Sequence, residues 1–187
     1  MPSDRGTQER PQSAFSKFIS FIVMIVFVVA LVWGLRTFVF VPYEIPSGSM
    51  EDTIMTGDMV FSEKITYYLG EPQQGDIITF ADPNVAGRTL IKRVIAVGGQ
   101  TVDLQNGHVV VDGQVLDEPY TEGKPSYPLE NSKITFPYTV PEGSVWVMGD
   151  NRTNSQDSRY FGAIKVSTIT GKAVWTYWPL SDIGILQ

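Results

Sequence analysis

"TVDLQNGHVVVDGQVLDE", residues 101–118, holds two closely spaced turn signals between short apolar segments. Asn106-Gly107 and Asp112-Gly113 are dipeptides that readily adopt the left-handed backbone of a two-residue type I′ hairpin turn. The flanking segments alternate between apolar and polar residues, as in strands with one buried face. The stretch therefore predicts three consecutive antiparallel strands, a β-meander.

Further short apolar segments lie on both sides of the meander, between clusters of glycine, proline and aspartate. They are "DMVFSEKI" (58–65), "DIITF" (76–80), "TLIKRVIAV" (89–97), "SVWVMGD" (144–150) and "ITGKAVWTYWPL" (169–180). Beyond the N-terminal region, no long stretch has a helical period of apolar residues. We therefore expect residues 37–187 to form a mainly β body, an antiparallel sheet or barrel-like fold, with the meander in a small lobe at about 99–143.

The N-terminal region contains the apolar run "FISFIVMIVFVVALVWGL", residues 18–35. Its length is close to the roughly 20 residues that span a bilayer, so we expect a transmembrane anchor at 18–36. A buried core helix would have a polar face, which this run lacks. A removable signal peptide would have a shorter apolar region followed by a small-x-small cleavage site. We interpret the run as a retained anchor.

The residues before the run are polar, and residues 1–17 predict a disordered tail. The tail carries three basic and two acidic side chains, whereas residues 37–187 carry 10 basic and 18 acidic ones. Positive charge on the N-terminal side favours a cytoplasmic tail and an extracytoplasmic body in the cell membrane.

Composition excludes several function classes. The net charge of −6 argues against a nucleic-acid-binding protein. The chain has no cysteine and one histidine, which excludes disulfides, thiolate metal sites and a cysteine nucleophile and argues against a zinc site. We expect no metal and no cofactor. The single histidine, His108, lies beside a hairpin turn, and we interpret it as a solvated polar residue rather than a member of a Ser-His-Asp triad.

Lys92 lies in a strand pattern that favours a buried position. Strand alternation places it on one face with Leu90, Val94 and Ala96. Burial disfavours the ammonium form and lowers the pKa of a lysine, and a neutral amine is a capable general base. From this pattern alone, an edge-strand lysine that reaches water is the more ordinary alternative.

Two polar stretches stand out beside apolar strands. "YEIPSGSMEDT" (43–53) is a hydroxyl-rich turn soon after the apolar run, and "GDNRTNSQDSRYFG" (149–162) directly follows a strand. The second stretch is too polar for a core, and Asp157 and Arg159 within it could form an ion pair.

Three of these stretches together resemble the bacterial type I signal peptidases in their compact single-anchor form. "PSGSM" (46–50) is similar to the nucleophile motif of that family, "IKRV" (91–94) to its lysine motif, and residues 149–162 to its most distinctive box. The resemblance covers roughly residues 18–180. A lone SGSM would be less specific, because self-cleaving Ser-Lys repressors carry a similar motif.

The resemblance implies a role for individual residues. It implies Ser49 as the catalytic nucleophile and Lys92 as its general base, with Ser47 as an oxyanion donor and Ser155 as the residue that orients the lysine amine. Supporting roles fall on Asp150, Asn151, Asp157 and Arg159, and contacts with the substrate on Ile45, Met50, Ile54, Leu90 and Ile91. Thr153 departs from the family pattern, in which aspartate is common, and this puts some local charge pairing in doubt.

The resemblance also implies a function: a serine endopeptidase that removes signal peptides from exported preproteins after small residues, in an Ala-x-Ala-like pattern. The implied partners are preprotein signal peptides and the phospholipid membrane, with the secretion translocon as a further candidate. Two alternatives remain at this point. One is a membrane-tethered β-domain that only binds cell-envelope partners, and the other is a Ser-Lys protease that cleaves itself.

Overall fold

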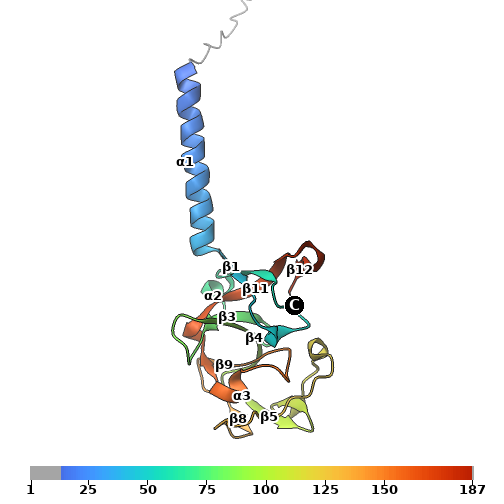
Figure 1. Ribbon diagram of the computed structural model, residues 1–187. Helices are drawn as coiled ribbons and strands as arrows, with labels where there is room; N and C mark the ends of the chain where they lie inside the picture. Colours follow the sequence, from blue (N-terminus) through green and yellow to red (C-terminus); the bar gives the residue numbers. More distant parts are fainter. Residues whose placement is uncertain (1–13, 187) are drawn as a thin grey trace, which may run out of the picture. The chain divides into compact units, whose positions relative to one another are not determined.

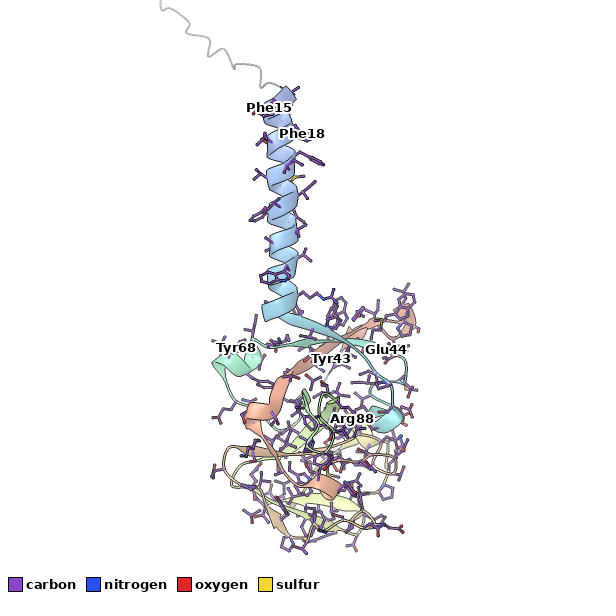
Figure 2. The ribbon with its side chains drawn as sticks, turned by 60° about the vertical axis from the view of Figure 1, so that its left-hand side comes forward. Phe15, Phe18, Tyr43, Glu44, Tyr68 and Arg88 are labelled. Atoms are coloured by element: carbon purple, nitrogen blue, oxygen red, sulfur yellow. The ribbon has the colours of Figure 1, made fainter. Side chains whose placement is uncertain are left out.

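The computed structural model describes residues 14–186, and these fall into two units, an N-terminal helix and a β-rich body that begins at Val39. The helix α1 (Ala14–Phe38) has 25 residues. Within it, residues 14–36 are long and apolar enough to cross a membrane. Figure 2 shows side chains, Phe15 and Phe18 among them, along the length of α1, and its apolar side chains are exposed.

The helix begins four residues before the apolar run. Residues 14–17, which we expected in the tail, form its first turn, because Ala14 and Lys17 are strong helix formers and no proline or glycine interrupts them. The rest of the expected tail, residues 1–13, lies outside the described residues.

The body is built on a large antiparallel sheet (Figure 1). Its strand order is β1-β2-β11-β3-β4-β9-β10, and β12 pairs with β11. The strands are β1 (Phe40–Glu44), β2 (Met59–Glu63), β3 (Ile77–Ala81), β4 (Thr89–Val97), β9 (Ser144–Met148), β10 (Ile164–Lys165), β11 (Ile169–Trp178) and β12 (Gly184–Ile185). Register shifts interrupt the pairing of β11 with β2 and of β4 with β9, and such bulges increase the twist and bend of a sheet.

A second, smaller sheet contains the meander, in the order β7-β6-β5-β8. Its strands are β5 (Thr101–Gln105), β6 (His108–Val111), β7 (Gln114–Val115) and β8 (Tyr138–Thr139). Asn106 and Asp112 have φ of 52° each, and the following glycines 84° and 80°, so both two-residue turns adopt the left-handed conformation that the sequence predicts. The prediction of a mainly antiparallel β body with a small meander sheet is confirmed.

Short helical segments complete the body. They are the α-helices α2 (Thr66–Leu69) and α3 (Ser158–Phe161) and the 3₁₀ turns η1 (Gly48–Met50), η2 (Pro119–Thr121), η3 (Val166–Thr168) and η4 (Leu180–Asp182). Of these, η1 and α3 matter most for the site, because they carry parts of the two polar stretches singled out in the sequence.

The large sheet is covered on both faces. Ile77 packs with Ile45 and Val60, whereas its neighbour Ile78 packs with Phe80 and Val94 in a second cluster. Strands buried on both faces have nearly continuous apolar runs, as β3 does. The alternation expected along β4 holds only to Val94. A register shift between Val94 and Ala96 moves Ala96 into a third cluster around Trp146, so Ala96 does not share the cluster of Val94.

The third cluster joins the small sheet to β4 and β9. Trp146 of β9 is fully buried there, and its ring lies 5.7 Å from that of Phe136 and 4.8 Å from that of Tyr138. Valines of β5 and β6 complete the cluster, so this tryptophan holds the small sheet against the large one.

Trp146→Ala should lower the free energy of unfolding by about 3–5 kcal/mol, the usual cost of removing a large buried ring. Trp146→Phe should cost less than about 2 kcal/mol, because it keeps the aromatic contacts and removes an indole N–H that has no hydrogen-bond partner among the described residues. Chemical denaturation of the two variants and the wild type measures both values. Equal costs for Ala and Phe would contradict the packing role.

Candidate active site

The serine turn follows β1 and is fixed by hydrogen bonds from distant segments. Its 3₁₀ turn η1 carries Ser49, whose exposed fraction is 8%. Asn151 donates from its backbone N–H to the Ser49 carbonyl at 3.2 Å and from Nδ2 to the Gly48 carbonyl at 2.9 Å. A Cβ at Gly149 would lie 2.3 Å from the Ser49 carbonyl oxygen, so only glycine permits this approach. The box of residues 149–162 therefore holds the serine turn directly.

Lys92 reaches Ser49 from β4. Its Nζ donates to Ser49 Oγ at 2.6 Å and to the Ile91 carbonyl at 2.8 Å. The residue is 3% exposed. The alternative of an edge-strand lysine that reaches water is therefore wrong, because the serine turn and the box cover the side chain that an isolated strand would leave open.

Burial lowers the pKa of Lys92 to about 8, against the attraction of the Asp157 and Asp150 carboxylates, which favours the charged form. Desolvation disfavours an ammonium group more than a free amine, and here it outweighs the nearby negative charge. A substantial fraction of Lys92 is therefore neutral at mildly alkaline pH.

Ser47 and Ser155 line the same cleft as Ser49 and Lys92. Ser47 is exposed and has extended backbone angles just before η1. Ser155 is buried, and its Oγ has no hydrogen-bond partner among the residues that the structure describes. The expected hydrogen bond between Ser155 and the Lys92 amine is therefore not formed in this structure, although the unpaired hydroxyl borders the same cleft.

Two buried ion pairs frame the site. Arg93 binds Asp150 through two hydrogen bonds of 2.9 and 2.7 Å, and Asp150 also accepts one from Thr53 at 2.6 Å. Arg159 binds Asp157 through Nε and Nη2, both at 2.9 Å. Buried charges are stable only when paired and hydrogen-bonded, as these four are. Both carboxylates belong to the box, and the Arg93–Asp150 pair connects the box to β4.

Asp157 also begins the short helix α3 and ties it to β9. It accepts hydrogen bonds from the backbone N–H of Arg159 and of Gly149, both at 3.1 Å.

Thr153 is exposed, and its hydroxyl donates to Asn151 Oδ1 at 3.3 Å. Position 153 takes part in no ion pair among the described residues, and both buried pairs are formed with threonine at this position.

Comparison with known proteins gives a consistent result. A family model described as signal peptidase, peptidase S26, matches residues 18–178. The chain belongs to this family. A probable signal peptidase I-1 of Synechocystis is 42% identical over 172 residues, covering 88% of this chain and 84% of that protein. A signal peptidase I of Mycobacterium tuberculosis is 37% identical, covering 97% of this chain and 79% of that protein.

A solved signal peptidase I from Enterococcus faecalis is 35% identical, with a TM-score of 0.47, and covers 56% of this chain and 97% of that one. The family assignment rests on the sequence matches. Together with the apolar helix α1, membership in this peptidase family identifies a membrane-anchored hydrolase.

The cleft of this family member has a volume of about 550 Å³. Of the five residues expected to contact the substrate, only Leu90 lines it. Ile45 and Met50 of the serine turn and Ile54 just after it are buried in the core, and Ile91 packs against them. These four do not line this cavity, and their contact with a bound substrate remains a prediction. The other lining residues are Ser47, Ser49, Asp82, Asn84, Arg88, Lys92, Leu129, Glu130, Thr153, Asn154, Ser155, Gln156, Tyr160 and Phe161.

His108 lies at the start of β6, exposed, and lines a different cavity from the one that holds Lys92. Within residues 14–186, no group of three or more His, Asp or Glu side chains could hold a metal ion. Sequence reasoning missed Arg93 as a site residue. The sequence could have indicated it, because strand alternation places Arg93 among apolar residues on the opposite face from Lys92, and a buried arginine needs a charged partner.

Lys92→Met should stabilise the protein at pH 7 by an amount on the order of 1–3 kcal/mol, because it removes a buried amine whose pKa falls from 10.5 to about 8 on folding. The unfolded chain binds this proton more tightly than the folded one. The cost of burial is therefore fully present below pH 8 and declines as the pH rises toward 10. Urea unfolding at pH 7 and pH 10 measures the difference. A methionine variant that is less stable at pH 7, or a pH-independent difference, would contradict this account.

Proposed function

We propose that this chain is a serine endopeptidase that removes N-terminal signal peptides from exported preproteins, with Ser49 as nucleophile and Lys92 as general base. The observation that carries the proposal is the contact of 2.6 Å between the Lys92 amine and Ser49 Oγ, made by a lysine with a lowered pKa. The names of the relatives support the substrate class.

The first half of the reaction forms an ester bond to Ser49 and breaks the C–N bond of the scissile peptide. Neutral Lys92 accepts the proton of the Ser49 hydroxyl, and the oxygen attacks the carbonyl carbon of the scissile peptide. Lys92 then gives the proton to the leaving amine, and an acyl-enzyme on Ser49 remains. In the second half, Lys92 takes a proton from a water molecule, whose oxygen attacks the ester carbonyl carbon. Lys92 then returns the proton to Ser49 Oγ as the ester C–O bond breaks, and the new carboxyl group is released.

The negative oxygen of the tetrahedral intermediate needs hydrogen-bond donors. The backbone N–H of Ser49 and the hydroxyl of Ser47 are the donors that we propose, since Ser47 is exposed to the cleft that Ser49 and Lys92 border. Ser155 Oγ has no hydrogen-bond partner among the described residues and borders the same cleft, so we propose that it accepts a hydrogen bond from the Lys92 amine when that amine reorients.

The substrate would bind as an added strand. β4 pairs with β3 from Thr89 to Arg93, but its pairing with β9 begins only at Arg93. One edge of residues 89–92 is therefore left without a strand among the described residues. An extended peptide laid between this edge and residues 43–47 gains backbone hydrogen bonds. We propose that the side-chain recesses beside this edge are shallow and favour small residues in an Ala-x-Ala-like pattern.

We propose that the tail before α1 is cytoplasmic and the body extracytoplasmic. The excess of basic residues before the apolar run and the acidic body support this orientation. It brings the peptidase to the side of the phospholipid membrane where exported preproteins emerge, next to the secretion translocon.

Ser49→Ala and Lys92→Arg should both abolish processing of a preprotein by the detergent-solubilised chain, and both should remain folded. An arginine keeps the charge but does not lose its proton, so Lys92→Arg should stay inactive even at pH 9. Exposed Lys133→Arg serves as the matched control and should keep wild-type activity.

Gel analysis of the processed preprotein and labelling by a serine-reactive probe measure these outcomes. Substantial turnover by Lys92→Arg would remove Lys92 from the mechanism. A chain that only binds envelope partners would not label at Ser49, and a self-cleaving protease would process itself at high dilution but no preprotein.

Ser47→Ala should lower kcat by roughly 10²–10³-fold, the effect of losing one oxyanion donor, and change KM little. Steady-state kinetics on a preprotein measures the two constants, with Ser181→Ala as a control that removes an exposed hydroxyl outside the cleft. A change in KM with kcat intact would mean that Ser47 only shapes the turn.

A further inference from the structure

One long segment between the two halves of the small sheet contacts the active-site frame at several points. We call residues 116–132 the arm. It lies between β7 and β8, and its regular structure is the single turn η2. The mechanism above uses none of its residues, yet several of them contact the buried arginines Arg93, Arg152 and Arg159. Two of these residues, Tyr120 and Glu118, make their contacts through large side chains.

Tyr120 of the arm covers Arg93. The Arg93 guanidinium carbon lies 3.9 Å from the centre of the Tyr120 ring. A guanidinium over an aromatic face is held by a cation–π attraction, which is stronger where water is excluded. Arg93 directly follows Lys92 in β4 and is bound in two places by Asp150. The ring therefore closes one side of the ion pair that borders the lysine.

Glu118 of the arm holds a second arginine. Its carboxylate accepts hydrogen bonds from Arg152 Nη1 at 2.8 Å and Nη2 at 2.5 Å, and from the Tyr120 hydroxyl at 3.0 Å. Arg152 is 1% exposed and donates from Nε to the Gly149 carbonyl at 2.9 Å. Gly149 is the residue whose missing Cβ makes room for the Ser49 carbonyl. A continuous set of contacts thus connects Glu118 to the serine turn.

A third contact joins Lys124 of the arm to Asp52, next to the serine turn, at 2.5 Å. Both side chains are partly exposed, so this pair adds little to stability. Further along the arm, Leu129 and Glu130 line the substrate cleft. The arm therefore passes from the two buried arginines to the cleft wall.

We propose that Tyr120 and Glu118 are positioning residues, and that the arm is a clamp that holds Lys92 and Ser49 at reacting distance. This inference rests on the proposed function, because it concerns how the proposed pair of Ser49 and Lys92 is positioned. A buried arginine and carboxylate give less stability than apolar side chains of the same volume, because both charges lose their water. The pair instead fixes orientation, because the guanidinium group of Arg152 binds both the Glu118 carboxylate and the Gly149 carbonyl.

The effect of the clamp can be measured as a change in the pKa of Lys92. The charged groups that act on its amine are Asp157, Asp150, Arg88 and Asp82. The Tyr120 ring helps hold the Arg93 guanidinium against Asp150. Removing the ring loosens this ion pair, and a less neutralised Asp150 carboxylate favours the charged form of Lys92. Its pKa should then rise toward the ordinary value, and the rate should reach half its maximum at a higher pH.

The test compares arm variants with matched controls in the full-length chain in detergent. Tyr120→Leu removes the ring, Tyr120→Phe keeps it, and Glu118→Gln removes the charge at constant shape. Tyr127→Leu is the control for the ring, since Tyr127 is an exposed tyrosine of the same arm. Asp117→Asn is the control for the charge, because Asp117 is the exposed neighbour of Glu118.

We expect Tyr120→Leu and Glu118→Gln to lower kcat at least 10-fold with KM changed less than twofold. Tyr120→Leu should also move the half-maximal pH of kcat upward by at least half a unit. Tyr120→Phe should recover most of the lost rate, and both controls should match the wild type. The fraction of folded molecules is measured by thermal unfolding at each pH.

Two results would overturn the clamp. One is a loss of kcat that is explained wholly by fewer folded molecules, with the half-maximal pH unchanged. The other is an equal loss of kcat in Tyr120→Leu and Tyr127→Leu. If the wild type processes no preprotein, the proposed function fails by itself. The clamp is then judged from the titration of the Lys92 amine by NMR, which Tyr120→Leu should shift upward and Tyr127→Leu should not. An unshifted amine in Tyr120→Leu would overturn it.

Discussion

The contact between the Lys92 amine and Ser49 Oγ, 2.6 Å long and shielded from water, is the interaction on which the rest of the site depends. A lysine in water is protonated at neutral pH and cannot accept a proton from a serine. Burial lowers the pKa of Lys92 to about 8, which makes a neutral amine available. The fold must therefore keep this side chain dry and still open a cleft to the substrate.

The large sheet meets this demand by burying β4 from Lys92 to Ala96. Within residues 14–186, no strand pairs with one edge of residues 89–92. The buried carboxylates Asp150 and Asp157 oppose the effect, since their charge favours the protonated amine. Each is neutralised by its own arginine, through the pairs with Arg93 and Arg159. The ion pairs thus fix the geometry of the site without holding Lys92 in its charged form.

Local signals in the sequence predicted the fold well, because hairpin turns depend on a few adjacent residues. Asn106-Gly107 and Asp112-Gly113 form the predicted turns. Motif resemblance singled out Ser49 and Lys92, which the fold brings together over 43 positions of sequence. Long-range packing was not predictable in this way. The bulge after Val94, the burial of Met50 of the serine turn and the contacts of Tyr120 depend on segments that meet only in the folded chain.

The most direct test of the account is an NMR titration of the Lys92 amine in the full-length protein, assigned by comparison with Lys92→Met. The account predicts that Lys92 loses its proton near pH 8, well before the exposed lysines, and that its titration moves when Ser49 is acylated by an inhibitor. A Lys92 amine that stays protonated to pH 10 together with the exposed lysines would contradict it, because no neutral base would then be available to Ser49.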